Sequence, residues 1–174
     1  MNSIVVHYQE IALKGRNRPW FISRLVANLR RATSDLDVRA VRPLMGRIEM
    51  VLGPTASYEQ VARRVSRVFG VANFSRAART GLDLAEVAAA INRDLGDVNP
   101  SSFRVSVRRA DKRFPMKSPE IEREVGGRIK LARGWRVDLS HPELTINVEI
   151  LSNEAVYSFG KDRGPGGLPS GASG

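Results

Sequence analysis

One ten-residue segment combines many cations with an aromatic ring. Five basic side chains surround Phe114 and Pro115 in this segment, namely Arg108, Arg109, Lys112, Arg113 and Lys117. Cations neutralise phosphates, and an exposed ring or a guanidinium plane stacks on an unpaired base. The mixture therefore indicates a site for single-stranded RNA. It is equally typical of a solvated loop whose Phe114 ring turns into the core.

A second basic cluster lies near the N-terminus. Lys14, Arg16 and Arg18 flank Gly15 at the point where a predicted strand gives way to a predicted helix. The first turn of a helix already favours anions, and three cations add to that field. This cluster predicts a further phosphate contact, with an ordinary basic loop as the alternative.

Catalytic and metal-binding patterns are absent from the sequence. The chain has no Cys, which excludes disulfides, thiolate metal sites, a Cys nucleophile and a persulfide-carrying Cys. His7 and His141 stand alone and make neither a metal site nor a triad. The glycines at 164–167 could cradle a phosphate, but no helix follows them, so a linker is the favoured interpretation. We expect no cofactor in this chain.

The overall charge favours a polyanionic partner. The formal net charge is +10 and the pI is about 10.9, which makes nucleic acid the leading partner class and an anionic membrane surface the other. Of 28 basic residues 23 are Arg, which suits phosphate recognition but also follows from a GC-rich genome. Residues 1–75 and 104–136 each hold a concentration of basic side chains.

The composition is that of a folded protein outside the membrane. Apolar residues make up 42% of the chain and charged residues 26%. The sequence shows neither the pattern of a signal peptide nor a run of about 18 apolar residues that could span a bilayer. We expect a soluble, cytoplasmic protein.

Residues 1–77 read as one domain. Strands are predicted at 3–8, 36–42, 46–52 and 71–77. One helix follows Pro19, and a second follows the capping box formed by Ser57 and Gln60. The order β-α-β-β-α-β is the ferredoxin-like pattern, an antiparallel sheet with two helices on one face.

Residues 78–163 read as a second, α/β domain, so that the fold class is α+β. A helix capped by Asp83 precedes a strand at 102–109. A second helix is capped by Ser118, and strands follow at 136–139, 143–150 and 154–159. Gly126 and Gly127 fall inside this second helix at a cost of about 1 kcal/mol each, so we expect them to allow close packing against the sheet. Residues 164–174 are rich in Gly and Pro and read as a linker.

An ordered set of motifs resembles the tRNA 4-thiouridine synthase family, the tRNA sulfurtransferases linked to thiamine biosynthesis. The first motif runs Tyr8-x-Glu10-Ile11-x-Leu13-Lys14-Gly15-x-Asn17-Arg18-x-x-Phe21. The second runs Arg108-Arg109-x-Asp111-Lys112-x-Phe114-Pro115-x-x-Ser118-x-Glu120, followed by Val125-Gly126, Val137-Asp138-Leu139, Pro142 and Val148-Glu149-Ile150. Gly166-Gly167-Leu168-Pro169-x-Gly171 is similar to the family's exit into its catalytic domain.

The resemblance implies a ferredoxin-like domain at 1–77, a THUMP domain at 78–163 and a linker at 164–174. In the family these domains hold tRNA by its acceptor stem and single-stranded 3′ CCA end. A separate ATP-pyrophosphatase domain then makes 4-thiouridine at position 8 with ATP, Mg²⁺ and a persulfide donor protein, and it takes part in the family's homodimer. Its S-G-G-x-D-S loop is absent here. We therefore expect either a piece of a longer protein or a gene for the binding half, without catalytic activity of its own.

Carried over to this chain, the resemblance places RNA contacts on both basic clusters. The predicted contacts are Arg108, Arg109, Lys112, Arg113, Phe114 and Lys117, with Lys14, Arg16 and Arg18. Weaker candidates are Arg123, Arg128, Lys130, Lys161 and Arg163, whereas the Asp111 carboxylate is expected to order its loop. Two alternatives stay open: the THUMP module of another tRNA-modifying enzyme such as a methyltransferase, and a ferredoxin-like pair that binds a small molecule or a protein.

Overall fold

The computed structural model describes residues 1–171, with the backbone alone at Ala12. The chain forms two compact units. The first unit contains Asn2–Arg76 and the segment that begins at Lys161, and the second contains Met1 and Ala77–Gly160. Each unit has its own hydrophobic core.

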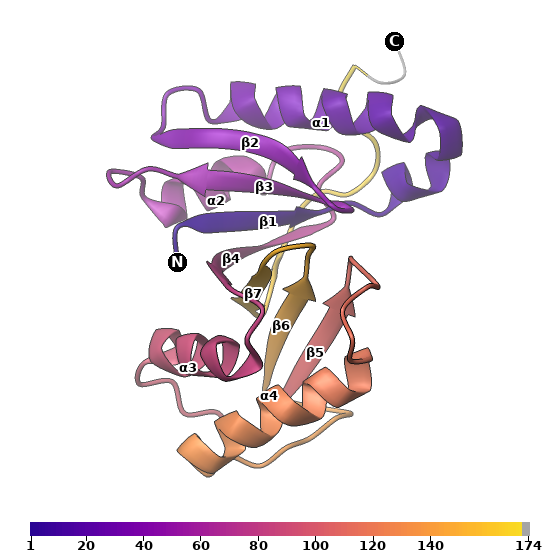
Figure 1. Ribbon diagram of the computed structural model, residues 1–174. Coiled ribbons are helices and arrows are strands. Elements are labelled where there is room, and N and C mark those ends of the chain that lie inside the picture. The colour runs from indigo at the N-terminus through magenta and orange to yellow at the C-terminus, as the bar shows by residue number, and fades with distance from the viewer. Residues whose placement is uncertain (172–174) are drawn as a thin grey trace. The chain divides into compact units, whose positions relative to one another are not determined.

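The first unit is an antiparallel sheet packed against two helices (Figure 1). Its strands lie in the order β2-β3-β1-β4, and β1 pairs antiparallel with β3. The sequence-predicted β-α-β-β-α-β order is confirmed, with one addition, the 3₁₀ helix η1. The elements are β1 (Ser3–His7), η1 (Glu10–Asn17), α1 (Arg18–Ala32), β2 (Val38–Leu44), β3 (Arg47–Leu52), α2 (Tyr58–Val65) and β4 (Asn73–Thr80).

Local sequence signals account for these helices. Pro19 occupies the first turn of α1, where its missing N–H costs nothing. The Ser57 side chain caps α2 by accepting a hydrogen bond from the Gln60 backbone N–H at 3.4 Å. Apolar side chains four residues apart, Leu25 with Leu29 and Val61 with Val65, then face the core.

In the second unit two helices share one core with the sheet (Figure 1). The second half of β4 pairs with β7, and the order continues β7-β6-β5. Strands β5 and β6 are parallel, with Val107 opposite Val148, because α4 makes the crossover between them. The elements are α3 (Leu84–Leu95), β5 (Phe103–Arg109), α4 (Ser118–Arg133), β6 (Leu144–Ile150) and β7 (Ala155–Phe159). The mixed α+β class is confirmed.

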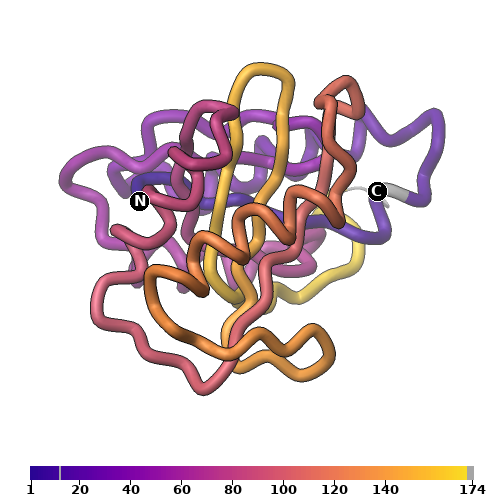
Figure 2. Tube along the Cα trace, turned by 60° about the horizontal axis from the view of Figure 1, so that its bottom comes forward, coloured from indigo at the N-terminus to yellow at the C-terminus, as the bar shows by residue number. Residues whose placement is uncertain are grey.

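Two predictions for the second unit are corrected. The strand predicted at 136–139 does not form: Val137 makes one isolated bridge to Phe103, and the chain doubles back after α4 before it enters β6 (Figure 2). Asp138 uses its carboxylate to bind the backbone N–H groups of Ser140 and His141, which turns the chain. The cap of α4 is Lys117 instead of Ser118, which is the first helical residue and makes no capping hydrogen bond.

The glycine pair in α4 also departs from expectation. A Cβ built on Gly126 would lie 3.7 Å from Val105 Cγ2, which is ordinary contact, and one on Gly127 would meet nothing within 4 Å. Close packing on the sheet therefore does not require either glycine, and at Gly127 the expectation was wrong. Core packing therefore does not explain why the helix contains two glycines that lower its stability.

Residues 161–171 form a strap that packs on the first unit. Strand β8 (Asp162–Arg163) pairs with the start of β4, and the Tyr58 hydroxyl donates to the Asp162 carboxylate at 2.9 Å. Backbone hydrogen bonds join Gly164 to Ala72 and Gly166 to both Gly70 and Val71, at 2.7–3.0 Å. The Leu168 side chain packs against the core, and the Ser170 carbonyl accepts from Arg24 and Asn28. The function of 164–174 as a linker to a further domain stays a prediction, and 172–174 lie outside the described residues.

Over residues 1–171, none of the helices combines the length and the apolar character that crossing a membrane requires.

The strap should contribute to the stability of the first unit. In Gly164→Ala, the new Cβ would lie 2.3 Å from the Val71 carbonyl oxygen, so the strap must shift away from Val71. We expect a loss of about 1–3 kcal/mol in the free energy of unfolding, measured by urea denaturation. Gly127→Ala is the matched control, because its Cβ meets nothing. It should gain roughly 0.4–1 kcal/mol by restricting the unfolded chain. An undiminished stability of Gly164→Ala would contradict this account of the strap.

Candidate nucleic-acid interface

The loop that joins β5 to α4 is held in shape by its own charged groups. The Asp111 carboxylate accepts hydrogen bonds from the Arg113 backbone N–H at 3.0 Å and from the Arg113 guanidinium at 2.6–3.1 Å. The guanidinium bonds hold the pKa of Asp111 well below its usual range. The Arg109 guanidinium donates to the carbonyls of Lys112 and Phe114 at 3.4 and 3.2 Å. Asp111 thus orders the loop, as its sequence position predicted.

These contacts divide the predicted RNA-contacting residues of the loop into two groups. Lys112 and Lys117 are exposed, and the Arg113 side chain is 83% exposed even though it is paired with Asp111. Phe114 is half-buried and packs against the second core, which makes it an anchor for the loop. Arg109 is also half-buried, and its guanidinium holds the loop by its hydrogen bond to the Phe114 carbonyl. The cations that the loop presents to solvent are therefore Lys112, Arg113 and Lys117.

Arg108 has a structural role in the sheet. It lies opposite Glu149 in the parallel register of β5 and β6, and its guanidinium binds the Glu149 carboxylate at 3.1 Å. Glu149 is buried, so its charge needs this partner. The sequence analysis grouped Arg108 with the exposed cations because an alternating strand pattern does not reveal a cross-strand carboxylate.

The N-terminal cluster lies on η1 and on the first turn of α1. Ile11 is fully buried and Phe21 nearly so, which fixes η1 against the core. Gly15 has a φ of 57°, a positive value that glycine adopts without a steric cost, and it produces a kink within η1. Lys14, Arg16 and Arg18 are all exposed as a result, with the Lys14 ammonium 5.8 Å from the centre of the Phe21 ring.

The charges at the start of α1 favour an anion. Its first turn contains no acidic residue, and its cap residue Asn17 makes no side-chain hydrogen bond to the helix. The helix dipole and the neighbouring cations then act in the same direction on a phosphate. Trp20 in this turn is 52% exposed and Leu13 on η1 is 85% exposed. The sequence analysis named Leu13 only as a member of the first motif, and Trp20 falls at an unspecified position of that motif.

The weaker candidates are placed on two elements. On α4, Arg123 and Lys130 are exposed, whereas Arg128 pairs with Glu124 one turn away at 2.8 Å. Lys161 and Arg163 are exposed on the strap.

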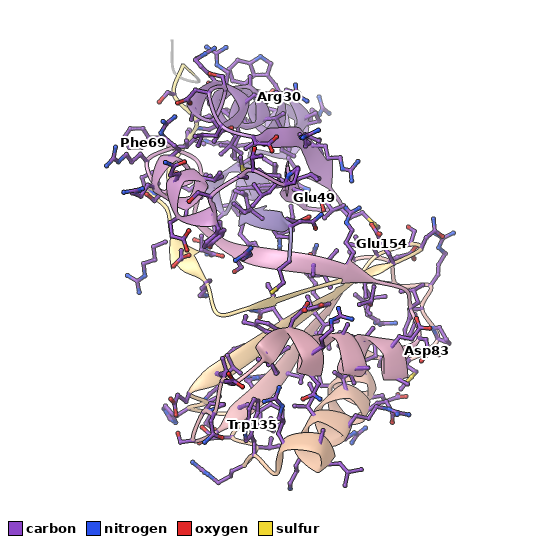
Figure 3. All side chains as sticks on the ribbon, turned by 90° about the vertical axis from the view of Figure 1, so that its left-hand side faces the viewer. Arg30, Glu49, Phe69, Asp83, Trp135 and Glu154 are labelled. Carbon is purple, nitrogen blue, oxygen red and sulfur yellow. The ribbon has the colours of Figure 1, made fainter. Side chains whose placement is uncertain are left out.

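A groove that the sequence analysis did not predict lies beside α4 in the second unit. It has a volume of about 450 Å³, and its lining comes from α4, from β5 and from the loop at 134–143. Trp135, which is labelled in Figure 3, stands at the start of this loop. It is buried, packs edge-on against Phe103 and donates from its indole N–H to Asn99. The signals in the sequence were the glycine pair in α4 and the apolar Val137 and Leu139, which we had assigned to a strand.

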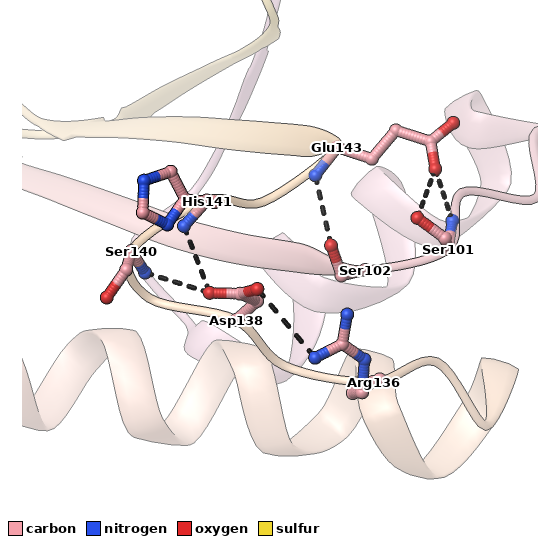
Figure 4. Close-up of polar contacts among 7 residues, drawn as sticks. All are labelled: Ser101, Ser102, Arg136, Asp138, Ser140, His141 and Glu143. Atoms are coloured by element: carbon pink, nitrogen blue, oxygen red, sulfur yellow. Dashed lines mark hydrogen bonds and ion pairs between the residues drawn. The ribbon is translucent and has the colours of Figure 1, made fainter.

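Carboxylates and hydroxyls fix the rest of that loop (Figure 4). Asp138 accepts the two backbone N–H groups of Ser140 and His141 at 3.0 Å, which lowers the pKa of Asp138, and it pairs with Arg136 at 3.7 Å. The Glu143 carboxylate accepts the backbone N–H and the hydroxyl of Ser101, which lowers the pKa of Glu143. The far end of the loop is thus tied to the segment that leads into β5.

Within residues 1–171 no group of three or more His, Asp or Glu side chains is arranged to hold a metal ion. Exposed cations occur on both units, at η1 and α1 in the first and at the β5–α4 loop and α4 in the second.

Comparisons with known proteins divide the chain at nearly the same place as its two compact units. Residues 3–75 match the ThiI ferredoxin-like domain, and residues 79–158 match the THUMP domain. The probable tRNA sulfurtransferase of Moorella thermoacetica is 42% identical over 174 residues, which are 99% of this chain and 44% of that protein. The chain therefore spans less than half the length of this curated relative.

Two solved structures share the fold over nearly the whole chain. PH1313 from Pyrococcus horikoshii superposes with a TM-score of 0.86 at 32% identity, covering 99% of this chain and 58% of that one. A 4-thiouridine synthetase–RNA complex with bound ATP superposes with a TM-score of 0.79 at 26% identity, covering 100% and 45%. The chain thus consists of a ThiI ferredoxin-like domain followed by a THUMP domain, and it corresponds to the N-terminal part of the tRNA sulfurtransferase family.

Proposed function

We propose that this chain is the tRNA-binding part of a tRNA sulfurtransferase. It would hold tRNA by the acceptor stem and the single-stranded 3′ CCA end while a catalytic domain makes 4-thiouridine at position 8. The observation that carries the proposal is the match of the entire chain to a 4-thiouridine synthetase that was solved with RNA. The net charge of +10 supports it, because phosphate neutralisation dominates the affinity of most RNA-binding surfaces.

Two surfaces would make the contacts. The β5–α4 loop presents Lys112, Arg113 and Lys117 on a frame that Asp111 and Arg109 hold in place, so little conformational entropy is lost on binding. The start of α1 presents Arg16 and Arg18, both exposed, in a first turn that contains no acidic residue. Phosphates would be the targets of both surfaces, which makes recognition depend on RNA shape more than on base sequence.

The chemistry would be performed outside this chain. The relative solved with RNA binds ATP, and we propose that ATP and Mg²⁺ activate the uridine on a catalytic domain, with sulfur delivered by a persulfide donor protein. This chain has no Cys and therefore cannot carry the persulfide. A homodimer of the whole protein would form through the catalytic domain.

Another tRNA-modifying enzyme with a THUMP domain, such as a methyltransferase, is the second candidate. The match of residues 3–75 to the ThiI ferredoxin-like domain favours the sulfurtransferase over this candidate. The first motif lies in that domain, and its apolar members Tyr8, Ile11 and Phe21 are the buried supports of η1.

The salt dependence of tRNA binding tests the proposed surface. If roughly five to eight phosphates are neutralised, the slope of log K against log salt is about −4 to −7. The double variant Lys112→Glu/Lys117→Glu should weaken the binding of all tRNAs alike and make this slope shallower by about one unit per lysine. Filter binding at several salt concentrations measures both quantities.

Arg93→Glu is the control for that experiment. Arg93 is 72% exposed on α3 and pairs only with its neighbour Asp94 among the ion pairs of residues 1–171, so the variant changes the charge without touching the loop. It should affect binding far less than the double variant. If the double variant keeps the affinity and the slope of the unmodified protein, the β5–α4 loop is not the RNA-binding surface.

The 3′ end should contribute to affinity by itself. Removing the CCA nucleotides from a tRNA takes away its unpaired bases but leaves the acceptor stem intact. Because each base held by a protein surface contributes roughly 1–3 kcal/mol, we expect a loss of at least about tenfold in affinity. Equal binding of the full and the shortened tRNA would mean that the chain reads the stem alone.

A further inference from the structure

We propose that a group of arginines at the end of α2 binds phosphates of the tRNA body, at a distance from the acceptor stem. The group consists of Arg63, Arg64 and Arg67, which line a hollow of about 270 Å³ together with Gln60. We call it the α2 arginine surface. This inference rests on the proposed function, because it assumes a tRNA ligand. It adds a second contact on the first unit to the one at the start of α1.

One member of the α2 arginine surface is fixed in place by a carboxylate. The Arg64 guanidinium binds both oxygens of the Asp35 carboxylate at 2.7 and 2.9 Å, and it also donates to the Ala32 carbonyl at 2.9 Å. The hydrogen bonds from Arg64 lower the pKa of Asp35 to about 2, so the pair is ionised at neutral pH. Arg64 is therefore a rigid wall of the hollow, and its charge is already offset.

The other two arginines have no carboxylate that offsets their charge. Arg63 and Arg67 are exposed, and no hydrogen bond or ion pair of their side chains occurs within residues 1–171. Glu59 stands one turn before Arg63, but over the same residues its carboxylate accepts from the Ser57 hydroxyl at 3.3 Å and pairs with no arginine. Like charges four residues apart on a helical surface repel each other. An anion placed between Arg63 and Arg67 would relieve this repulsion.

The end of α2 explains only part of this charge. Cations in the last turn of a helix interact favourably with its carbonyl end, and Arg63 and Arg64 occupy that turn. Arg67 lies beyond Val65, where the helix ends. It contributes to the following turn through its backbone N–H, which donates to the Arg64 carbonyl at 3.2 Å. The fold of the described residues therefore makes no use of the Arg67 guanidinium.

An exposed aromatic ring next to these cations favours RNA over a free anion. Phe69 follows Arg67 by two residues, is 55% exposed and lies on the outside of the first unit (Figure 3). The backbone N–H of Gly70 donates to the Gly166 carbonyl of the strap at 2.8 Å, which holds this turn in place. Cations bind phosphates, and a ring packs against a ribose or an unpaired base. The combination suits RNA better than inorganic phosphate.

The α2 arginine surface lies at the opposite end of α1 from the contact proposed above. Arg16 and Arg18 stand at the beginning of α1, whereas Arg64 donates to Ala32, its last residue. At roughly 1.5 Å per residue, the 15 residues of α1 span about 20 Å. A ligand that contacts both ends must reach about 20 Å along the first unit. A whole tRNA can do so, whereas a hairpin of about four base pairs is too short at roughly 3.4 Å or less per pair.

The first test compares a whole tRNA with such a short hairpin that carries the same single-stranded 3′ tail. Arg63→Glu/Arg67→Glu should weaken the binding of the whole tRNA by about tenfold and make the slope of log K against log salt shallower by about two units. It should leave the binding of the short hairpin unchanged. Arg63→Lys/Arg67→Lys keeps both charges and should bind like the unmodified protein. If the glutamate variant loses its fold by circular dichroism, Arg67→Gln replaces it, with a slope shallower by about one unit.

A cleavage probe locates the contact on the RNA. The chain has no Cys, so Arg67→Cys can carry an iron–EDTA group at one position only. Hydroxyl radicals generated there should cut the whole tRNA at nucleotides outside the acceptor stem. Arg93→Cys on α3 is the matched control, because Arg93 is exposed and lies in the other unit. It should not cut the same nucleotides.

The outcomes separate this inference from the proposed function. If Arg63→Glu/Arg67→Glu keeps the affinity and the slope for the whole tRNA, the inference is overturned while the proposed function stands. The same conclusion follows if the variant weakens the short hairpin equally, or if position 67 cuts only the acceptor stem or nothing. Unchanged tRNA binding together with lost binding of poly-glutamate would assign the surface to an acidic protein instead. If the unmodified protein binds neither RNA, the proposed function fails.

Discussion

Mutual repulsion among the basic side chains is the constraint that shapes this protein. With 28 Lys and Arg against 18 Asp and Glu, the carboxylates cannot offset every cation, so their placement decides which cations remain available. Carboxylates are used where a guanidinium must be held in the fold: Glu149 holds Arg108 in the sheet, Asp111 shapes a loop through Arg113, and Glu122 positions Arg104. Lysines 112, 117 and 130 are left exposed, as flexible point charges suited to phosphates.

The features predicted from the sequence are those that depend on near neighbours. Helix α2 begins where Ser57 and Gln60 predicted it, and α1 contains Pro19 in its first turn, because caps and prolines act within one turn. The alternation of Phe103, Val105 and Val107 located β5 for the same reason. Exposure of Lys112 and Lys117 followed from the polar loop around them.

The features that were missed depend on residues far apart in the sequence. Arg108 pairs with a carboxylate 41 residues away, which no local pattern reveals. Val137 to Leu139 alternates like a strand, yet Asp138 turns the chain there, and the apolar pair lines a groove with α4 instead. The segment at 164–171 has the composition of a linker, but its backbone N–H and carbonyl groups meet those of Gly70, Val71 and Ala72 across the first unit.

The strap has a consequence for how the protein is made. The first unit uses residues on both sides of the second unit in the sequence, so its β4 edge stays unpaired at Asn73 and Phe74 until Asp162 and Arg163 have been synthesised. At roughly 5–20 residues per second, a ribosome takes several seconds to make the intervening second unit. During that interval the nascent N-terminal domain exposes a strand edge and an incomplete core. The THUMP domain, in contrast, draws all its strands from one continuous stretch and can fold before the domain that precedes it is complete.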